Sequence, residues 1–439
     1  MNFPRILAAV GAAFLLLTGR GLATNPLITD QFTADPTARV FEGKIYVYPS
    51  HDIPYSPGRG RTNWFIMEDY HAFSSENLND WTDHGMILNQ TNVPWLNRQS
   101  FDMWAPDCVF KNGKYYFYFP TGGRIGVAIA DKPYGPFKPE EKPIAGANGI
   151  DPCVLIDKDG SAYLFWARGR ISVAKLKENM VELDSPPMVI TNLPTKGLIE
   201  GPFAFERNGI YYLTYPHANT NTERLEYSIS TNPMGPYQPG GVILDEAADG
   251  CWTVHQSMVE YRGQWYLFYH DKDLSPGFDK NRSIRAEYLS FNPNGSIRKV
   301  TPTLRGVGIV DATSKIQIDR YTAISREGVA VSFLNETNPF AGWKISLTQR
   351  GNWVQFDKVD FGKGTLKSVH LRAASPEGGA VEIHLNAVDG PLLAKVAIGK
   401  NAEWQTVQTK LRRIPAGMHD LVVTRGRGQP VELDWISFQ

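Results

Sequence analysis

Five segments of the chain repeat one phrase, and this repeat decides the fold. They are DPTARVFEGKIYVYPS (35–50), APDCVFKNGKYYFYFP (105–120), DPCVLIDKDGSAYLFWA (151–167), EGPFAFERNGIYYLTYP (200–216) and HQSMVEYRGQWYLFYHD (255–271). Each begins with a small or polar residue, enters a strand, turns at a glycine and returns as an aromatic strand, as a β-hairpin does. Phrases such as IGVAIADKPYGPFKP (125–139) follow several hairpins and predict a third and a fourth strand.

Four strands repeated five times predict a five-bladed β-propeller over residues 24–305, because radial repetition leaves only short, protected sheet edges. The same hairpins could also build a β-sandwich or barrel, but those folds lack so regular a double phrase. The repeat stops after the fifth hairpin. Residues 314–439 contain short strands between Gly, Pro and Asn turns and predict a separate β-sandwich that packs against the propeller.

The N-terminus and the composition restrict cellular location and partners. Residues 1–23 combine Arg5, an apolar run over 6–17 and a small-x-small triplet at 21–23, which predicts a cleaved signal peptide and a secreted or periplasmic protein. The apolar run is shorter than the roughly 20 residues that span a bilayer, so no membrane span is expected. Lys plus Arg and Asp plus Glu number 45 each, which argues against nucleic acid as a partner. The three cysteines, Cys108, Cys153 and Cys251, are expected to be buried, with one disulfide as the alternative.

The register of the repeat brings ionisable residues together. The first residues of the five phrases are Asp35, Ala105, Asp151, Glu200 and His255. Equivalent positions in a propeller face the central axis at one end, so these side chains should converge where lone ionisable groups are rarely buried without a role. Each aspartate could instead cap its own turn. Convergence favours catalysis, because glycosidic cleavage needs one ionised and one protonated carboxyl group.

At these residues the chain resembles glycoside hydrolase family 43, a five-bladed propeller family of arabinofuranosidases, xylosidases and endo-arabinanases. The supporting phrases are WAPD (104–107), GPF (135–137) and FSSENLNDW (73–81). The resemblance implies that Asp35 is the general base, that Asp151 orients the acid and raises its pKa, and that Glu200 is the general acid. It also implies inversion of configuration without a catalytic cofactor, with Asp35 and Glu200 about 6.5 to 9.5 Å apart.

Four further residues are candidates for substrate contact. Trp104 could stack on a sugar or pack in the core. His255 could lie near a central calcium, as in similar enzymes, or be a buried hydrogen-bonding histidine. Arg282 and Arg285, in DKNRSIRAEY (279–288), could reach sugar hydroxyls, and one of them could simply form an ion pair.

The C-terminal region resembles a family 6 carbohydrate-binding module, from KIQIDRYTAIS (315–325) through GNWVQFDKVDFG (351–362) to LDWISFQ (433–439). In such modules an acid in the first phrase and an aspartate in the last bind a structural calcium. Asp319 and Asp434 match those places, although Asp319 replaces the more usual glutamate. Both could also be surface-turn carboxylates, and the module could be a structural support.

The expected function is that of an exo-acting α-L-arabinofuranosidase on plant polysaccharides such as arabinan, arabinoxylan or xyloglucan side chains. A β-xylosidase or a bifunctional enzyme is the alternative within the same chemistry. From other classes, the chain could be a silent carbohydrate-binding propeller or a retaining fructan hydrolase of family 32. All three acids are present, and the Asn-Asp-Pro-Asn-Gly phrase of family 32 is absent from the sequence.

Overall fold

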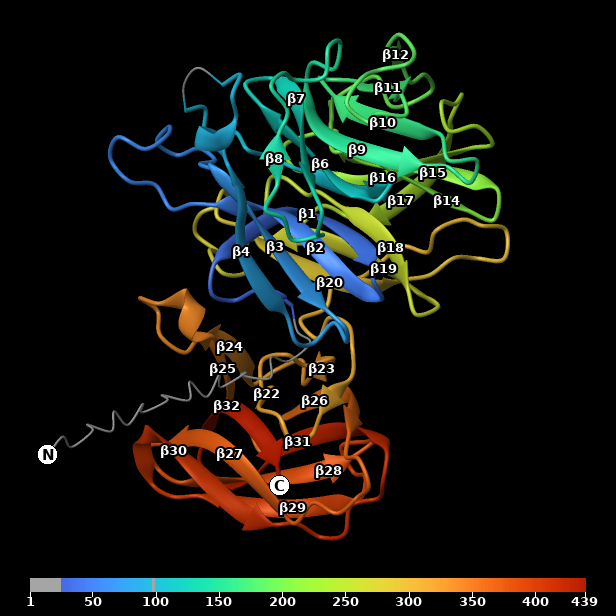
Figure 1. Ribbon diagram of the computed structural model, residues 1–439. Coiled ribbons are helices and arrows are strands. Elements are labelled where there is room, and N and C mark those ends of the chain that lie inside the picture. Colours follow the sequence, from blue (N-terminus) through green and yellow to red (C-terminus); the bar gives the residue numbers. More distant parts are fainter. Residues whose placement is uncertain (1–24, 97–98) are drawn as a thin grey trace, which may run out of the picture.

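The computed structural model describes residues 25–96 and 99–439, and the predicted signal peptide lies outside these residues. Figure 1 shows two bodies of β-strands, the N-terminal one from blue to yellow and the C-terminal one from orange to red. The described helical elements are two short 3-10 turns, Gln90–Asn92 and Pro339–Ala341. The prediction of an all-β chain is confirmed.

The N-terminal body consists of five separate antiparallel sheets. The first three contain β1 (Phe32–Phe41), β2 (Lys44–Asp52), β3 (Asp69–Ser75) and β4 (Thr82–Asn89); β5 (Asp107–Lys111), β6 (Lys114–Thr121), β7 (Arg124–Ala130) and β8 (Lys138–Pro139); and β9 (Ile150–Ile156), β10 (Ala162–Ala167), β11 (Ile171–Lys175) and β12 (Met188–Val189). The last two contain β13 (Leu198–Ile199), β14 (Phe203–Arg207), β15 (Ile210–Ala218), β16 (Arg224–Ser230) and β17 (Gln238–Leu244); and β18 (Ser257–Tyr261), β19 (Gln264–Asp271) and β20 (Ser283–Leu289).

The first strand of each repeated phrase lies at the centre of this body. Strand β1 contacts β5, β5 contacts β9, β9 contacts β14, β14 contacts β18, and β18 contacts β1 again. The five inner strands therefore form a closed ring, the arrangement of a propeller. Buried aromatic side chains fill the space between neighbouring sheets. Phe117 of the second sheet, for example, lies 5.8 Å from Tyr48 and 5.0 Å from Tyr70 of the first, measured between ring centroids.

The segment before β1 closes the ring by pairing with the last sheet. The backbone N–H of Leu27 donates to Ile284 O at 2.8 Å, and that of Thr33 donates to Arg282 O at 2.9 Å. The fully buried Asn25 side chain donates to Ala286 O, Glu287 Oε1 and Thr303 O at 3.1, 2.9 and 2.8 Å, and accepts from the Ala286 N–H at 2.8 Å. The start of the described chain is thus hydrogen-bonded to β20, the edge strand of the three-stranded last sheet.

The C-terminal body is a sandwich of two six-stranded sheets around one apolar core. One sheet contains β21 (Val310–Asp311), β23 (Ala323–Ile324), β26 (Trp353–Asp360), β28 (Gly379–Leu385), β29 (Leu392–Ile398) and β31 (Met418–Gly428). The other contains β22 (Ile316–Gln317), β24 (Val329–Phe333), β25 (Trp343–Leu347), β27 (Ser368–Ser375), β30 (Asn401–Lys410) and β32 (Val431–Phe438). The prediction of a β-sandwich after the propeller is confirmed.

The two bodies touch, as the sequence predicts. The rings of Phe32 and Phe340 lie 4.9 Å apart, and Lys358 Nζ lies 4.6 Å from the centroid of Tyr288. Two clefts of about 690 and 490 Å³ lie between the two bodies and are lined by residues of both. The three cysteines are buried as free thiols, so the disulfide alternative is wrong. Within residues 25–96 and 99–439, no helix has the length and apolar character to cross a bilayer.

Asn25→Ala removes all four side-chain hydrogen bonds that join the N-terminal segment to the last sheet. The buried groups left without partners should lower the free energy of unfolding by about 1–3 kcal/mol, measured by urea denaturation. Asn219→Ala, at an exposed loop position, is the matched control and should leave stability unchanged. Equal stability of the two variants would show that Asn25 does not hold the ring closed.

Candidate active site

A small pocket of about 160 Å³ lies where the inner strands begin. Its wall contains Asp35, Asp151 and Glu200, the three carboxylates that open repeated phrases in the sequence. Its lining residues are Asp35, Trp64, Phe65, Met67, Trp104, Ile150, Asp151, Glu200, Trp252, Thr253, Val254, His255 and Arg282. The repeat therefore predicts the convergence correctly. Three tryptophans and one phenylalanine are among the ten other lining residues.

Local backbone geometry turns the two aspartates into the pocket. Asp35 and Asp151 each have a positive φ, of 46° and 56°, which is rare for a residue other than glycine. In both hairpins the strand pairing shifts register at this position, between Ala34 and Thr37 in one and opposite Phe165 and Ala167 in the other. A bulge redirects a side chain at the cost of local strain, and such strain is concentrated at functional sites.

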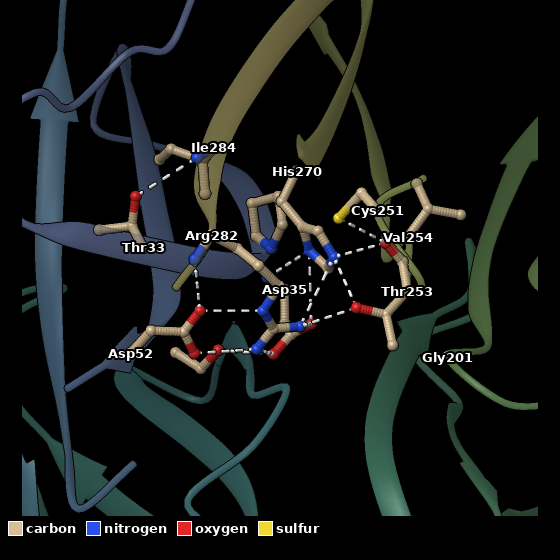
Figure 2. Close-up of polar contacts among 12 residues, drawn as sticks. Thr33, Asp35, Asp52, Gly201, Cys251, Thr253, Val254, His270, Arg282 and Ile284 are labelled. Atoms are coloured by element: carbon tan, nitrogen blue, oxygen red, sulfur yellow. Dashed lines mark hydrogen bonds and ion pairs between the residues drawn. The ribbon is translucent and has the colours of Figure 1, made fainter. Parts of the chain in front are cut away.

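Arg282 is the cation of the pocket, and it bridges two buried carboxylates (Figure 2). Its Nη1 and Nη2 donate to Asp35 Oδ1 and Oδ2 at 2.9 and 3.1 Å. Its Nε and Nη2 donate to Asp52 Oδ2 and Oδ1 at 2.9 and 3.0 Å. Burial alone would raise the pKa of Asp35, but the Arg282 guanidinium and a 2.5 Å hydrogen bond from Ser50 hold it well below its usual range. Asp35 is therefore ionised at neutral pH.

His270 supports Asp35 from behind as a neutral ring. Its Nδ1 accepts from the Asp35 backbone N–H at 3.0 Å, and its Nε2 lies 3.1 Å from Thr253 O. An accepting Nδ1 places the proton on Nε2, which can donate to that carbonyl. Burial and the nearby Arg282 charge lower the pKa of His270 to about 3, in agreement with this neutral state.

Glu200 and Asp151 occupy the opposite electrostatic environment. Burial and the charge of Asp35 raise the pKa of Glu200 to about 7, and burial and the charge of Glu200 raise the pKa of Asp151 well above its usual range. The Gly201 N–H donates to Asp151 Oδ2 at 2.9 Å and so links the two acids through the backbone. Gly201 has φ +52°, and a Cβ there would lie 2.8 Å from Pro216 and 2.9 Å from His255 Nδ1, so only glycine fits.

A fourth carboxyl group, Glu223, lies beside Glu200 and was not predicted. It is 1% exposed, its Oε2 accepts from the Val254 N–H at 3.0 Å, and its Oε1 is buried without a hydrogen-bond partner among the described residues. Burial and the charge of Glu200 raise the pKa of Glu223 well above its usual range, so Glu223 is protonated at neutral pH.

The predicted substrate-contact residues separate into two groups. Trp104, His255 and Arg282 line the pocket. The Nε1 of Trp104 is buried and makes no hydrogen bond within the described part of the chain. Burial lowers the pKa of His255 to about 4, which keeps this ring neutral.

Arg285 lies away from the pocket. Arg285 lies in β20 and Arg282 directly precedes that strand, and residues three apart in extended chain point to opposite sides. There it forms ion pairs with Asp271 and Asp273 and donates to Thr303 O at 2.7 Å. The alternative that one of the two arginines simply forms an ion pair therefore applies to Arg285. Arg282 forms ion pairs and also lines the pocket.

The two predicted calcium ligands lie close together in the sandwich. The Ile318 N–H donates to Asp434 O at 2.8 Å, and the charge of Asp319 contributes to the raised pKa of the buried Asp434. Each carboxylate already has a guanidinium partner, Arg320 Nε at 2.8 Å from Asp319 and Arg372 beside Asp434. Calcium takes about six to eight oxygen ligands, and two arginine-paired carboxylates do not fit that requirement. The calcium stays a prediction that this geometry does not support.

Residues outside the phrase openings were missed for a structural reason. Asp52 and His270 lie at the ends of the second hairpin strands, and Glu223 lies in the connection between β15 and β16. Pairing in the first hairpin sets Ser50 opposite Ala34, so the end of β2 necessarily lies beside Asp35. That pairing could have suggested Ser50 and Asp52. Nothing in a single sequence marks Glu223.

The pocket thus contains a carboxylate held ionised by an arginine and a carboxylic acid held protonated by burial. An ionised carboxylate can accept a proton from water, and a neutral acid can donate one to a leaving oxygen. Acid–base cleavage of an acetal requires two carboxyl groups with different pKa values, one protonated and one ionised. The two environments in this pocket produce that difference.

Comparison with known proteins gives the same result. Residues 23–297 match the model of Glycosyl hydrolases family 43, and residues 324–439 match that of Carbohydrate binding module (family 6). Xylosidase/arabinosidase 43A of Humicola insolens is 36% identical over 62% of this chain and 98% of its own length. Arabinoxylan arabinofuranohydrolase of Bacillus subtilis is 29% identical over 94% of this chain and 92% of its own length. A β-xylosidase/α-arabinofuranosidase from a compost metagenome, solved with xylotriose, is 35% identical, covers 64% of this chain and 98% of its own, and superposes with a TM-score of 0.58.

Arg282→Gln leaves the Asp35 and Asp52 carboxylates buried without a full positive charge. Removing one partner of a buried ion pair costs about 3–5 kcal/mol, so we expect the free energy of unfolding at pH 7 to fall by that order. In the wild type Asp35 stays ionised down to pH 4, but in the variant burial without the guanidinium raises the pKa of Asp35, so this carboxylate takes up a proton as the pH falls and the penalty is relieved. The difference between wild type and variant should therefore shrink toward pH 4.

Urea denaturation between pH 4 and pH 8 measures this difference. Arg262→Gln, at an exposed position, is the control and should show little change. A penalty for Arg282→Gln that stays constant over this range would contradict the assignment of Arg282 as the counter-ion of Asp35.

Proposed function

The chain belongs to family 43 of the glycosyl hydrolases, and from this we propose that it releases single pentose units from the ends or side chains of xylan-type polysaccharides. The observation that carries the proposal is the contrast between an ionised Asp35 and a protonated Glu200 in one pocket. Asp35 acts as general base on a water molecule, and Glu200 protonates the glycosidic oxygen of the leaving group. Asp151 orients the peptide that carries Glu200, through Gly201.

The single-step mechanism follows from these roles. The base removes a proton from water as the water attacks the anomeric carbon, and the acid gives its proton to the departing oxygen. This displacement inverts the configuration and needs no catalytic cofactor. Arg282 keeps Asp35 ionised before the reaction, and its fixed position limits rearrangement as the carboxylate gains a proton.

Two pentoses are candidates for the released sugar. The sequence favours α-L-arabinofuranose, and the names of the relatives support β-D-xylose equally. We infer that the enzyme accepts both terminal sugars, since its small, aromatic-lined pocket suits one ring and the two pentoses present similar hydroxyl groups. The family 6 module supports a polymeric substrate, arabinoxylan in the first place. Arabinan and xyloglucan are further candidates, and residues 1–23 would direct export to the periplasm or medium.

Hydrolysis of 4-nitrophenyl β-D-xyloside and 4-nitrophenyl α-L-arabinofuranoside tests the proposal. Wild type should cleave both, and Asp35→Asn should lower kcat/KM by about 10²–10⁴-fold on both, the range for loss of a general base. Glu200→Gln should retain activity on these activated substrates but lose it on xylobiose, whose leaving group needs protonation. Asp245→Asn, an exposed carboxylate paired with Lys299, is the control. Cleavage of neither substrate, or full activity of Asp35→Asn, would refute the assignment.

The acid should set the alkaline limb of the pH profile. With the pKa of Glu200 at about 7, kcat/KM on xylobiose should decline above about pH 7 as this group loses its proton. The neutral acid Glu223 lies beside Glu200 and can donate its proton to the ionised form, which lowers the pKa of Glu200. Glu223→Met should therefore move the alkaline limb to higher pH, whereas Glu223→Gln keeps an N–H donor and should leave the limb close to that of wild type.

A purely structural role for Glu223 would change the rate or the stability without moving the limb. An unchanged limb in a folded Glu223→Met protein, or a limb moved to lower pH, would overturn the assignment of Glu223 as the residue that lowers the pKa of Glu200.

A further inference from the structure

Two histidines and an aspartate gather on the first sheet, outside the pocket. Because Ser50 pairs with Tyr70, His51 faces Asp69 across β2 and β3, and Asp69 and His71 are two residues apart on one face of β3. One potential ligand atom from each of the three side chains lies within 4.8 Å of the others. No other group of three or more such side chains meets this distance among residues 25–96 and 99–439. We call these three residues the blade-one histidine cluster.

Hydrogen bonds already orient the cluster. His71 Nδ1 lies 3.1 Å from Asp83 Oδ1, and Asp83 itself accepts from the Gly85 N–H at 2.7 Å and from Gln31 Nε2 at 3.1 Å. A carboxylate on one ring nitrogen fixes the tautomer and leaves the other nitrogen as a ligand, as in the carboxylate–histidine–zinc arrangement. Neither His51 nor His71 uses its Nε2 in a hydrogen bond to another described residue.

The cluster is sheltered but reachable from solvent. The side chains of His51, Asp69 and His71 are 22%, 13% and 19% exposed, and the two imidazole rings lie 5.2 Å apart. Strands hold ligands more precisely than loops do. We propose that the blade-one histidine cluster binds one divalent transition-metal ion, Zn²⁺ in the first instance, through His51, Asp69 and His71, with water in the fourth position.

The donor set selects the class of metal. Two imidazole nitrogens and one carboxylate suit zinc and its neighbours, whereas calcium and magnesium prefer all-oxygen sites. Zinc–ligand distances of about 2.0–2.1 Å separate tetrahedral ligand atoms by roughly 3.4 Å, so small side-chain rotations are enough to close the set. His51 Nδ1 and Asp69 Oδ1 now share a hydrogen bond of 2.6 Å. When the metal takes the place of this hydrogen bond at Nδ1, the ring proton of a neutral His51 moves to the free Nε2 through solvent, so the imidazole remains a neutral ligand.

The position of the cluster links it to the pocket. His51 lies between Ser50, which donates to Asp35, and Asp52, which accepts from Arg282. A metal on His51 would therefore fix the strand that supports both groups, without itself touching the pocket. The metal proposal rests on the cluster alone and does not depend on the proposed function.

Isothermal titration of the chelator-treated full-length protein with ZnCl₂ tests the inference. Wild type should bind one equivalent at micromolar or lower Kd and unfold at a higher temperature with zinc than without it. His71→Ala should abolish this binding, and Asp83→Asn should weaken it by about 10–100-fold, the usual effect of losing a carboxylate behind a metal-bound histidine. His419→Ala, in the sandwich, is the matched control and should bind as wild type does.

Asp69→Asn provides a second variant if His71→Ala does not fold, as judged by circular dichroism. Absence of binding to wild type would show that the hydrogen bonds already present satisfy the cluster, and it would overturn the proposal. So would zinc binding that survives in both His71→Ala and Asp69→Asn, because the ion would then lie elsewhere.

Discussion

The ion-pair network around Arg282 is the interaction on which the rest of the site depends. Arg282 precedes β20, the last strand of the propeller, yet its guanidinium is buried between Asp35 of β1 and Asp52 of β2. These elements meet only because the ring of sheets closes, and Asn25 and the segment before β1 tie that closure together. The ionisation of Asp35 is therefore a consequence of the tertiary fold. No local feature of the DPT sequence would lower its pKa while burying it.

The same closure creates the opposite condition on the other side of the pocket. One arginine faces several carboxyl groups, and its four hydrogen bonds to carboxylates all go to Asp35 and Asp52. Asp151 and Glu223 are buried and Glu200 is partly buried, and none of the three has a guanidinium partner among the described residues, so their pKa values rise. An uneven distribution of one positive charge thus produces a base and an acid from chemically similar side chains. Aromatic residues around them exclude water and strengthen both effects.

Much of this arrangement could be predicted from the sequence, because aligning the five repeated phrases shows which residues occupy equivalent positions in the sheets. Equivalent phrases predicted the propeller and the convergence of Asp35, Asp151 and Glu200, and the loss of the repeat predicted the sandwich. Contacts between sheets could not be predicted in this way, because His270 reaches the pocket from the end of β19 and Glu223 from the connection between β15 and β16. Alternation along β20 separates Arg282 from Arg285, but which face points inward depends on the closed ring. The match of Asp319 and Asp434 to single positions of a family motif likewise did not predict that each would pair with an arginine.

The stereochemistry of the first product tests the central claim most directly, because Asp35 can act either as a base on water or as a nucleophile. Proton NMR of 4-nitrophenyl β-D-xyloside during its hydrolysis resolves the anomeric signals before mutarotation mixes them. An ionised Asp35 that activates water predicts that α-xylose appears first and that β-xylose follows only as the anomers equilibrate. Initial release of β-xylose would mean a covalent intermediate and two displacements, and would contradict the account.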